Sequence, residues 1–181
     1  MAKGKSQFVG AAGQFYLSYS LAIREIHASL TLGNAPSVDV LASSADGKRT
    51  LSFQVKTARN AHRRNRYQHE GYEWYVGASA VGNHHPSFWY AFVDMQEQGQ
   101  EWNPKVFFVP SLWVSNFVKP DWPMFLYFLP QTARDLTYEN WTVVKDYLAG
   151  DQSATDWANS WPEEKLVKWG APPETISQDH A

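Results

Sequence analysis

Two alternating apolar and polar stretches, joined by a tight turn, contain the side chains best suited to chemistry. Asp39 precedes the turn, and Gln54 and Lys56 follow it. The turn contains Asp46-Gly47, and Asp-Gly between alternating apolar and polar stretches is the strongest short signal for a β-hairpin. If these two residues form the loop, Asp39 lies directly opposite Gln54, and directly opposite side chains share one face.

Strand alternation then gathers a carboxylate, an amide and an ammonium group on one face of the predicted hairpin. Side chains two positions apart point the same way, so Lys56 joins Gln54 and Asp39. A slip of one residue in the pairing would separate these groups. The other face of the second strand is apolar and consists of Leu51, Phe53 and Val55.

Short motifs surround this hairpin. Residues 8–14 (FVGAAGQ) open a predicted helix, residues 37–39 (SVD) precede the Gly-containing turn, and residues 53–57 (FQVKT) follow it. A later predicted strand leads through residues 109–111 (VPS) into another helix. Together these motifs resemble the PD-(D/E)XK nuclease superfamily, which includes many restriction enzymes and Holliday-junction resolvases. The similarity extends over roughly residues 8–118.

The resemblance implies a fold and a set of roles. The fold is a mixed α/β (α+β) domain with a restriction-endonuclease-like core: an N-terminal helix, a central mixed β-sheet whose hairpin carries the motif, and flanking helices. The family's helix usually supplies a Glu, which falls on Gln14, while the motif positions fall on Asp39, Gln54 and Lys56. By this likeness Asp39 and Gln54 would hold Mg²⁺, with Mn²⁺ as a substitute, and Lys56 would act on the nucleophile or the transition state.

Two glutamines depart from the family's pattern. Gln14 and Gln54 replace acids, so Asp39 is the last carboxylate of the motif, and an amide oxygen brings no negative charge to a metal. We expect an enzyme, a metal-dependent endonuclease that hydrolyses DNA phosphodiester bonds. The alternative is a catalytically weak or inactive nuclease-fold protein that binds nucleic acid or a protein partner. A third reading is an unrelated α+β protein in which Asp39 and Lys56 form an exposed ion pair, worth under about 1 kcal/mol.

The positive charge is concentrated around the motif lysine. The formal net charge is −2, yet seven of the sixteen Lys and Arg residues lie between Lys48 and Arg66. Clustered cations can neutralise phosphates despite a neutral average, whereas a solvated loop is the competing interpretation. The predicted nucleic-acid-binding residues are Lys48, Arg49, Arg59, Arg63, Arg64 and Arg66.

Other chemistries have little support. The chain has no cysteine, which excludes disulfides, thiolate zinc sites and Cys nucleophiles. The six histidines show no metal-ligand spacing, and neither a Gly-rich phosphate loop nor a serine nucleophile elbow is present. Most aromatic residues are expected in the core, and Trp74 and Tyr75, which follow the basic segment, are the candidates for base stacking.

Periodicity and turn signals outline the elements that must position these residues. The predicted helices cover residues 8–26, 111–118 and 138–148. The predicted strands cover residues 28–32, 38–42, 50–56, 73–76, 88–93, 105–109 and 125–129. Ser111 and Thr137 are the expected N-caps of the second and third helices, and Gly150 closes the third.

Length and composition predict a globular protein. With 181 residues, 44% of them hydrophobic, we expect one domain over residues 1–150 and a C-terminal helical extension over 151–181 that ends in disorder. No signal peptide and no run of about 18 apolar residues is present, which suggests a cytoplasmic protein without a membrane partner. A homodimer is expected on functional grounds, because enzymes that cut duplex DNA commonly pair two sites.

Overall fold

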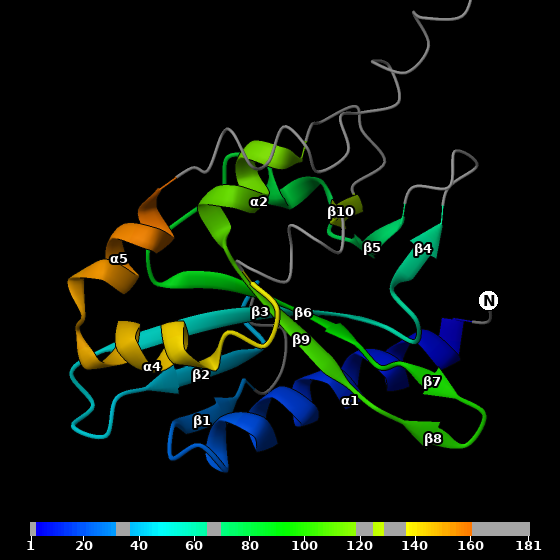
Figure 1. Cartoon of the computed structure of the whole chain (residues 1–181), viewed down its shortest axis with the longest axis horizontal. Coiled ribbons are helices and arrows are strands. Elements are labelled where there is room, and N and C mark those ends of the chain that lie inside the picture. The colour runs from blue at the N-terminus through cyan, green and yellow to red at the C-terminus, as the bar shows by residue number, and fades with distance from the viewer. Residues whose placement is uncertain (1–2, 32–36, 65–69, 119–124, 129–136, 161–181) are drawn as a thin grey trace, which may run out of the picture.

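The computed structural model describes residues 3–31, 37–64, 70–118, 125–128 and 137–160 (Figure 1). Its helices are α1 (Lys3–Ala22), α2 (Ser111–Phe117), α4 (Trp141–Ala149) and α5 (Gln152–Asn159), with a 3-10 turn η1 (Ala78–Ala80). The strands are β1 (His27–Leu30), β2 (Val40–Ser43), β3 (Thr50–Ala58), β4 (His62–Arg64), β5 (Glu70–Tyr75), β6 (Phe88–Asp94), β7 (Glu97–Gln98), β8 (Glu101–Trp102), β9 (Lys105–Pro110) and β10 (Phe125–Phe128). Within those ranges, none of the helices combines the length and apolarity that crossing a bilayer requires. The predicted extension beyond residue 160 lies outside the described residues.

A mixed five-stranded sheet forms the centre of the protein, in the order β1-β2-β3-β6-β9. Strand β2 is antiparallel to both β1 and β3, β6 is parallel to β3, and β9 is antiparallel to β6. Strand β5 pairs with β4 and β10 in a second sheet, and β7 and β8 form a short ribbon. The fold is therefore mixed α+β with a central mixed sheet and flanking helices, as predicted.

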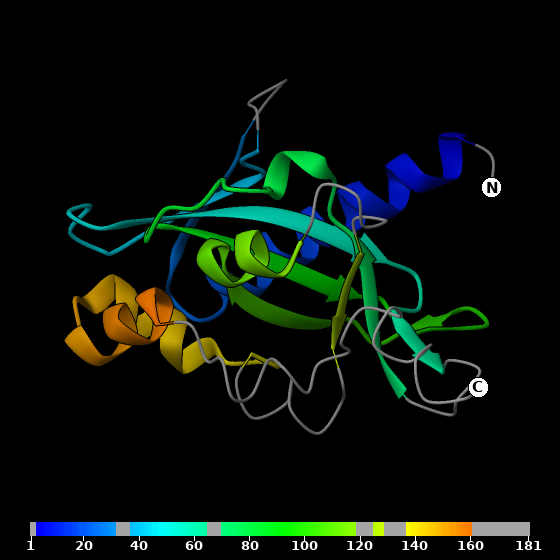
Figure 2. The same ribbon diagram turned by 90° about the horizontal axis from the view of Figure 1, so that it is seen from above.

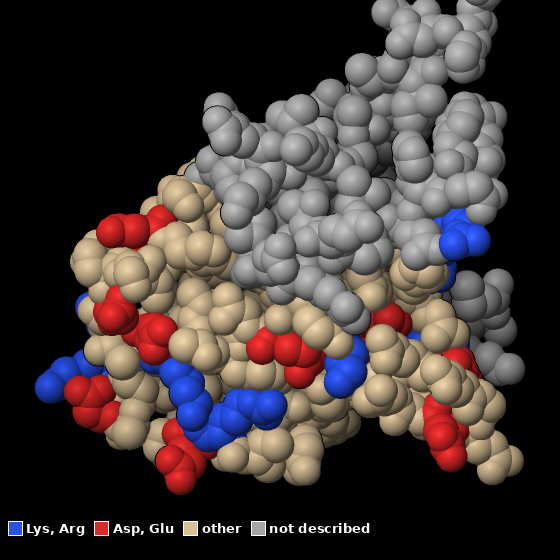
Figure 3. All heavy atoms as spheres, in the orientation of Figure 1, with Lys and Arg blue, Asp and Glu red and all other residues tan. Residues whose placement is uncertain are grey.

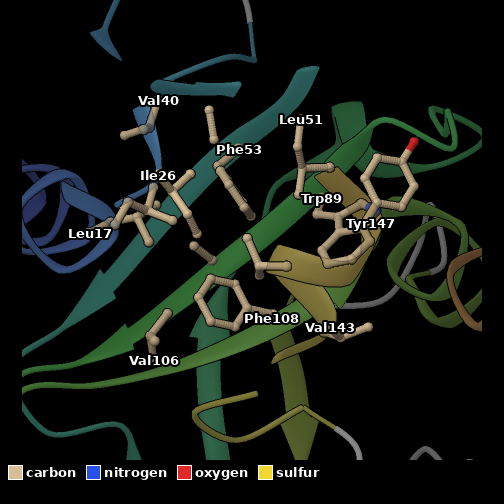
Figure 4. Close-up of a cluster of buried hydrophobic side chains, with 14 of the residues drawn as sticks. Leu17, Ile26, Val40, Leu51, Phe53, Trp89, Val106, Phe108, Val143 and Tyr147 are labelled. Atoms are coloured by element: carbon tan, nitrogen blue, oxygen red, sulfur yellow. The ribbon is translucent and has the colours of Figure 1, made fainter. Parts of the chain in front are cut away.

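Helices α1, α4 and α5 cover one face of the central sheet, where their side chains form a hydrophobic core (Figures 1 and 4). Leu17 of α1 and Ala158 of α5 are both buried in this layer. Alternate residues of β3, namely Leu51, Phe53 and Val55, point into it. Each fully buried large apolar side chain contributes roughly 1.5–3 kcal/mol, so this core holds the hairpin with its predicted apolar face inward.

The opposite face of the sheet carries β5, η1 and α2 (Figure 1) and a second core that is rich in aromatic rings. Tyr90 and Phe92 of β6 stack there with ring centroids 5.6 Å apart, and Trp113 of α2 is buried against the same layer. Gln54 and Lys56 pair with Tyr90 and Phe92 along the ladder, so they emerge on this side. The two polar residues of the motif are therefore neighbours of an aromatic layer.

The predicted register of the hairpin is confirmed. Val40 faces Phe53, which is the pairing that a loop centred on Asp46-Gly47 requires. Gly47 has a φ of 70°, a left-handed conformation that glycine adopts at little cost.

The predicted limits of the first helix are wrong at both ends. Helix α1 begins at Lys3 and ends at Ala22, instead of covering residues 8–26. Glu25 takes a φ of 63°, and the Ile26 N–H donates back to the Leu21 carbonyl at 3.1 Å. This is a Schellman-type closure, which ends a helix by satisfying its last carbonyl groups.

Both predicted N-caps are also wrong. Ser111 is buried, and its hydroxyl bonds to the backbone of His85 as donor and acceptor instead of capping α2. Helix α4 begins after residue 138, the predicted start, so Thr137 lies too far upstream and the Asn140 side chain is the cap. Gly150 ends α4 with a φ of 90°, as predicted. Two hydroxyl residues were suitable caps by type, but tertiary contacts decided their roles.

Candidate active site

The candidate site lies where β2 and β3 separate. The last pair of the hairpin ladder is Val40 with Phe53, and the chain bends at Asp39. Asp39 still pairs with the β1 side, because its carbonyl accepts from the Thr31 N–H at 3.0 Å. On the other side, the Asp39 N–H donates to the Phe53 carbonyl at 2.8 Å. The predicted ladder pair of Asp39 with Gln54 therefore does not form.

The Asp39 carboxylate forms hydrogen bonds in place of the backbone pair between Asp39 and Gln54, which does not form. Its Oδ2 accepts from the Val55 N–H at 2.7 Å, and its Oδ1 accepts from the Gln14 Nε2 at 2.9 Å. Hydrogen bonds to an ionised group are roughly twice as strong as neutral ones, so a side chain now holds β2 against β3. The same bonds bring Gln14 from α1 to the motif carboxylate, 25 residues away in the chain.

Helix α1 reaches Asp39 because it crosses β3 at very short distance. A Cβ atom at Gly13 would overlap the side chain of Thr57, so glycine is required at this crossing. Gln14 is the next residue and therefore starts at the contact point between helix and strand. The Thr57 hydroxyl is buried there without a hydrogen-bond partner among the residues that the structure describes.

Lys56 is the cation of the site, and it lacks a direct partner. Its side chain is half-buried and forms no hydrogen bond or ion pair within the described ranges. Burial lowers the pKa of Lys56, and the nearby Asp39 carboxylate opposes this shift through space. A half-buried cation without an ion pair is poorly solvated, and an anionic ligand would relieve that condition.

Aromatic residues of β6 explain the burial of this lysine. In the parallel register, Gln54 lies beside Tyr90 and Lys56 beside Phe92. Burial raises the pKa of Tyr90 to about 12, which indicates that this layer solvates charge poorly. Gln54 is half-buried as well, and its amide makes no hydrogen bond in the described part of the chain. Sequence reasoning missed Tyr90 and Phe92, because pairing between strands so far apart in the chain leaves no local signal.

Two of the predicted nucleic-acid-binding residues lie far from the site. Lys48 and Arg49 are at the closed end of the hairpin, just before β3, and the extended chain from Arg49 to Lys56 spans roughly 23 Å at about 3.3 Å per residue. Figures 1 and 2 show the hairpin loop and β4 at opposite ends of the molecule. Lys48 is also paired with Asp46 at 3.2 Å. These two residues therefore do not join Lys56 in one basic patch.

The remaining arginines lie at the site's end of the sheet, and two of them have acidic neighbours. Arg59 follows β3 directly and pairs with Glu97 at 2.7 Å. Arg63 and Arg64 belong to β4, and the Arg63 Nε lies 4.0 Å from a carboxylate of β5. Arg66 lies outside the described residues. On the face shown in Figure 3, basic and acidic side chains are interspersed, so a phosphate backbone would meet separate cations there.

The two aromatic residues predicted for base stacking differ in exposure. Trp74 is buried, and its indole N–H donates to the Val93 carbonyl at 3.0 Å, so that prediction is wrong for Trp74. Tyr75 is largely exposed and keeps a surface on which a base could stack.

The side chains of the site offer only the smallest number of carboxylate ligands with which proteins bind Mg²⁺. Among the described residues, no group of three or more His, Cys, Asp or Glu side chains could hold a metal. Each Asp39 oxygen accepts one hydrogen bond and keeps a further lone pair. The side-chain amide oxygen of Gln54 accepts no hydrogen bond from the residues that the structure describes. Mg²⁺ binds through one or two carboxylates plus phosphate and water, and Asp39 supplies one such carboxylate.

Comparison of the chain with protein families, with curated proteins and with solved structures finds no match. The chemistry of the site is therefore argued from its own geometry. That geometry unites Asp39, Gln14 and Lys56 at one fork in the sheet.

Proposed function

We propose that this protein is a metal-dependent endonuclease that hydrolyses DNA phosphodiester bonds at the fork between β2 and β3. One observation carries the proposal: Lys56 is half-buried beside the Asp39 carboxylate and forms no ion pair with any described residue, while Asp39 itself is held by Val55 and Gln14. A half-buried cation without an ion pair lowers the stability of the folded protein, and groups of this kind cluster at functional sites. The simplest alternative is an exposed ion pair between Asp39 and Lys56. In such a pair, Lys56 would be exposed to solvent and in direct contact with Asp39.

The order of elements supports the proposal. A helix is followed by an antiparallel hairpin, and the second hairpin strand, β3, is parallel to the later strand β6. This is compatible with the restriction-endonuclease-like core that the sequence resembles. In addition, the helix residue at the family's acidic position, Gln14, bonds to the residue at the motif Asp position.

The side chains of the site suit a phosphodiester. The Lys56 ammonium offers three donors, and its attraction for a phosphate or an attacking oxygen is stronger beside the aromatic layer than in water. Its position would stabilise the charge that develops in the transition state. Asp39 is kept in place by two hydrogen bonds from different elements, so the carboxylate and ammonium are positioned before the substrate arrives.

A bound Mg²⁺ would polarise the phosphoryl group and help to form the attacking hydroxide. Asp39 and the Gln54 carbonyl would hold it, and Mn²⁺ would be an acceptable substitute. Gln14 would keep its role of orienting Asp39 through the Nε2 hydrogen bond.

A second candidate is a nuclease-fold protein that binds nucleic acid or a protein partner without cleavage. The observation that favours it is the hydrogen bond from Gln14 to Asp39, because a Glu at this position would leave both carboxylates free for a metal. With amides at Gln14 and Gln54, the site has lost two negative charges and with them much of its attraction for a cation.

Nicking of supercoiled plasmid as a function of Mg²⁺ concentration separates the two candidates. For an endonuclease, Gln54→Glu should lower the Mg²⁺ concentration needed for half-maximal nicking, because a second carboxylate strengthens metal binding. Gln100→Glu, which adds the same charge at an exposed turn between β7 and β8, should leave the metal dependence unchanged. Absence of nicking in wild type and in Gln54→Glu, with DNA binding retained, would establish the binding protein instead.

A further inference from the structure

The outer side of α1 carries a stripe of large apolar side chains. Phe8, Phe15, Tyr19 and Ile23 are 78%, 63%, 63% and 57% exposed, respectively. Ala12 lies between them, half-buried at the edge of the core, and at 3.6 residues per turn all five fall within one arc of the helix. The opposite side of the same helix packs into the core, so the stripe points away from the protein.

This stripe is as large as the largest apolar patches found on monomeric proteins. Aromatic side chains cover about 150–250 Å² each, so the exposed parts of these four residues amount to roughly 500 Å². That lies within the range of roughly 300–600 Å² for the largest apolar patch on a typical monomer, a size that is often functional. It is also more than half of the roughly 800 Å² that each partner buries in a standard interface.

The charge of the helix restricts what can cover the stripe. Between Lys5 and Arg24 the chain has no charged residue. Arg24 itself turns back, since its guanidinium donates to the Ser20 carbonyl and lies 3.9 Å from the Trp141 ring centroid. A nucleic acid would need cations here, and a helix lying in a lipid surface would need a cationic polar face. An uncharged apolar partner fits better, and two copies of this stripe would meet without repulsion.

The spacing of the stripe suits a second copy. Successive members are separated by four, three, four and four residues, which is nearly the same when read from either end. In an antiparallel pair with its two-fold axis near Phe15, Phe8 would face Ile23 of the other copy. The small Ala12 would face the large Tyr19, and such alternation lets side chains interdigitate.

We propose that the chain forms a homodimer by antiparallel packing of two α1 helices through this stripe. Such a pairing is isologous, because each copy contributes the same surface. The exposed apolar area is smaller than each partner buries in a standard stable interface, which fits a weak, concentration-dependent dimer. The dimer stands independently of the proposed nuclease activity, although Gln14 on the inner side of α1 touches Asp39 and places the interface close to the site.

Sedimentation velocity between about 1 and 100 µM tests the proposal. Wild type should shift from monomer to dimer over this range, and Phe15→Glu should weaken association at least tenfold, because it buries two charges beside the two-fold axis. Gln7→Glu is the matched control, since it adds one exposed charge to the same helix away from the stripe. Wild type that stays monomeric at 100 µM, or Phe15→Glu that dimerises like wild type, would overturn the proposal. If Phe15→Glu melts abnormally by circular dichroism, Phe15→Ser replaces it.

Cysteine cross-linking tests the orientation. The chain has no cysteine, so a single introduced thiol can form a disulfide only with another copy. Under mild oxidation, Phe15→Cys should cross-link rapidly, because two copies of this residue meet at the axis. Phe8→Cys alone should cross-link slowly, but a mixture of Phe8→Cys and Ile23→Cys should form the mixed dimer. Rapid cross-linking of Phe8→Cys alone would contradict the antiparallel arrangement.

Discussion

The two ends of the central hairpin each hold a lysine and an aspartate, and they differ in solvation. At the closed end, Lys48 and Asp46 form an ion pair of 3.2 Å, with 82% and 55% of their side chains exposed. At the open end, Lys56 is half-buried and forms no ion pair with Asp39, whose oxygens accept from the backbone and from Gln14.

This difference separates a surface pair from a candidate site. Water solvates both members of the exposed pair, so its contribution to stability is small whatever its geometry. At the open end, burial lowers the pKa of Lys56 because the charged form is disfavoured. The buried charge of Lys56 lowers the stability of the folded protein, and a bound anionic ligand could offset this cost.

Neutralising the aspartate at each end of the hairpin should give the largest difference in nicking between the two ends. Asp39→Asn keeps an oxygen for the Val55 N–H but loses the charge, so we expect nicking to fall by about 100-fold or more. The free energy of unfolding should fall by about 1 kcal/mol, because a charge-assisted hydrogen bond becomes a neutral one. Asp46→Asn should leave nicking unchanged and alter stability by less than about 1 kcal/mol.

Plasmid nicking and urea denaturation of both variants measure this contrast. Nicking that persists undiminished in Asp39→Asn would show that the activity belongs to another site or to a contaminant.

Removal of the two lysine charges should separate activity from stability. Lys56→Met should lower nicking by about 100-fold and yet raise the free energy of unfolding at neutral pH. Because the folded pKa of Lys56 lies below the unfolded value of 10.5, the cost of its charge is present in full below the folded pKa. That cost disappears as the pH rises toward and past 10.5. The stability advantage of Lys56→Met should therefore narrow with rising pH.

Urea denaturation between pH 7 and pH 10 measures this trend, with Lys48→Met as the control. Lys48→Met should change stability by less than about 0.5 kcal/mol and leave nicking intact. A Lys56→Met variant that is less stable than wild type at pH 7 would indicate a stabilising ion pair and remove the main argument for the site.

The two glycines of α1 provide the most local test, with the smallest expected effect on nicking. Gly13→Ala should cost about 1–3 kcal/mol, because its methyl group would overlap Thr57 where the helix crosses β3. Gly10→Ala meets nothing within 4 Å and should gain up to about 1 kcal/mol from helix propensity. Denaturation midpoints of both variants decide this, and equal effects of the two substitutions would argue against the close crossing. Gly13→Ala should also reduce nicking, since it displaces Gln14 from Asp39.

Much of the local structure could be predicted from the sequence. The Asp46-Gly47 turn determined the hairpin register, and the alternation along β3 determined that Leu51 faces the core while Lys56 does not. These features depend on neighbours in the chain: a turn type fixes the pairing of the strands beside it, and the period of two then assigns every side chain to a face. The candidacy of Asp39, Gln54 and Lys56 followed from the same local rules.

The environment of those residues was decided only by the tertiary structure. No local pattern indicates that β2 leaves β3 at Asp39, because the bend depends on a carboxylate that bonds to the Val55 N–H and to a helix 25 residues upstream. The burial of Lys56 is set by its surroundings in the folded sheet, where β6, a parallel neighbour far along the chain, places Phe92 beside it. Local rules determine which way a side chain points, whereas its solvation and partners depend on segments that meet only when the chain has folded.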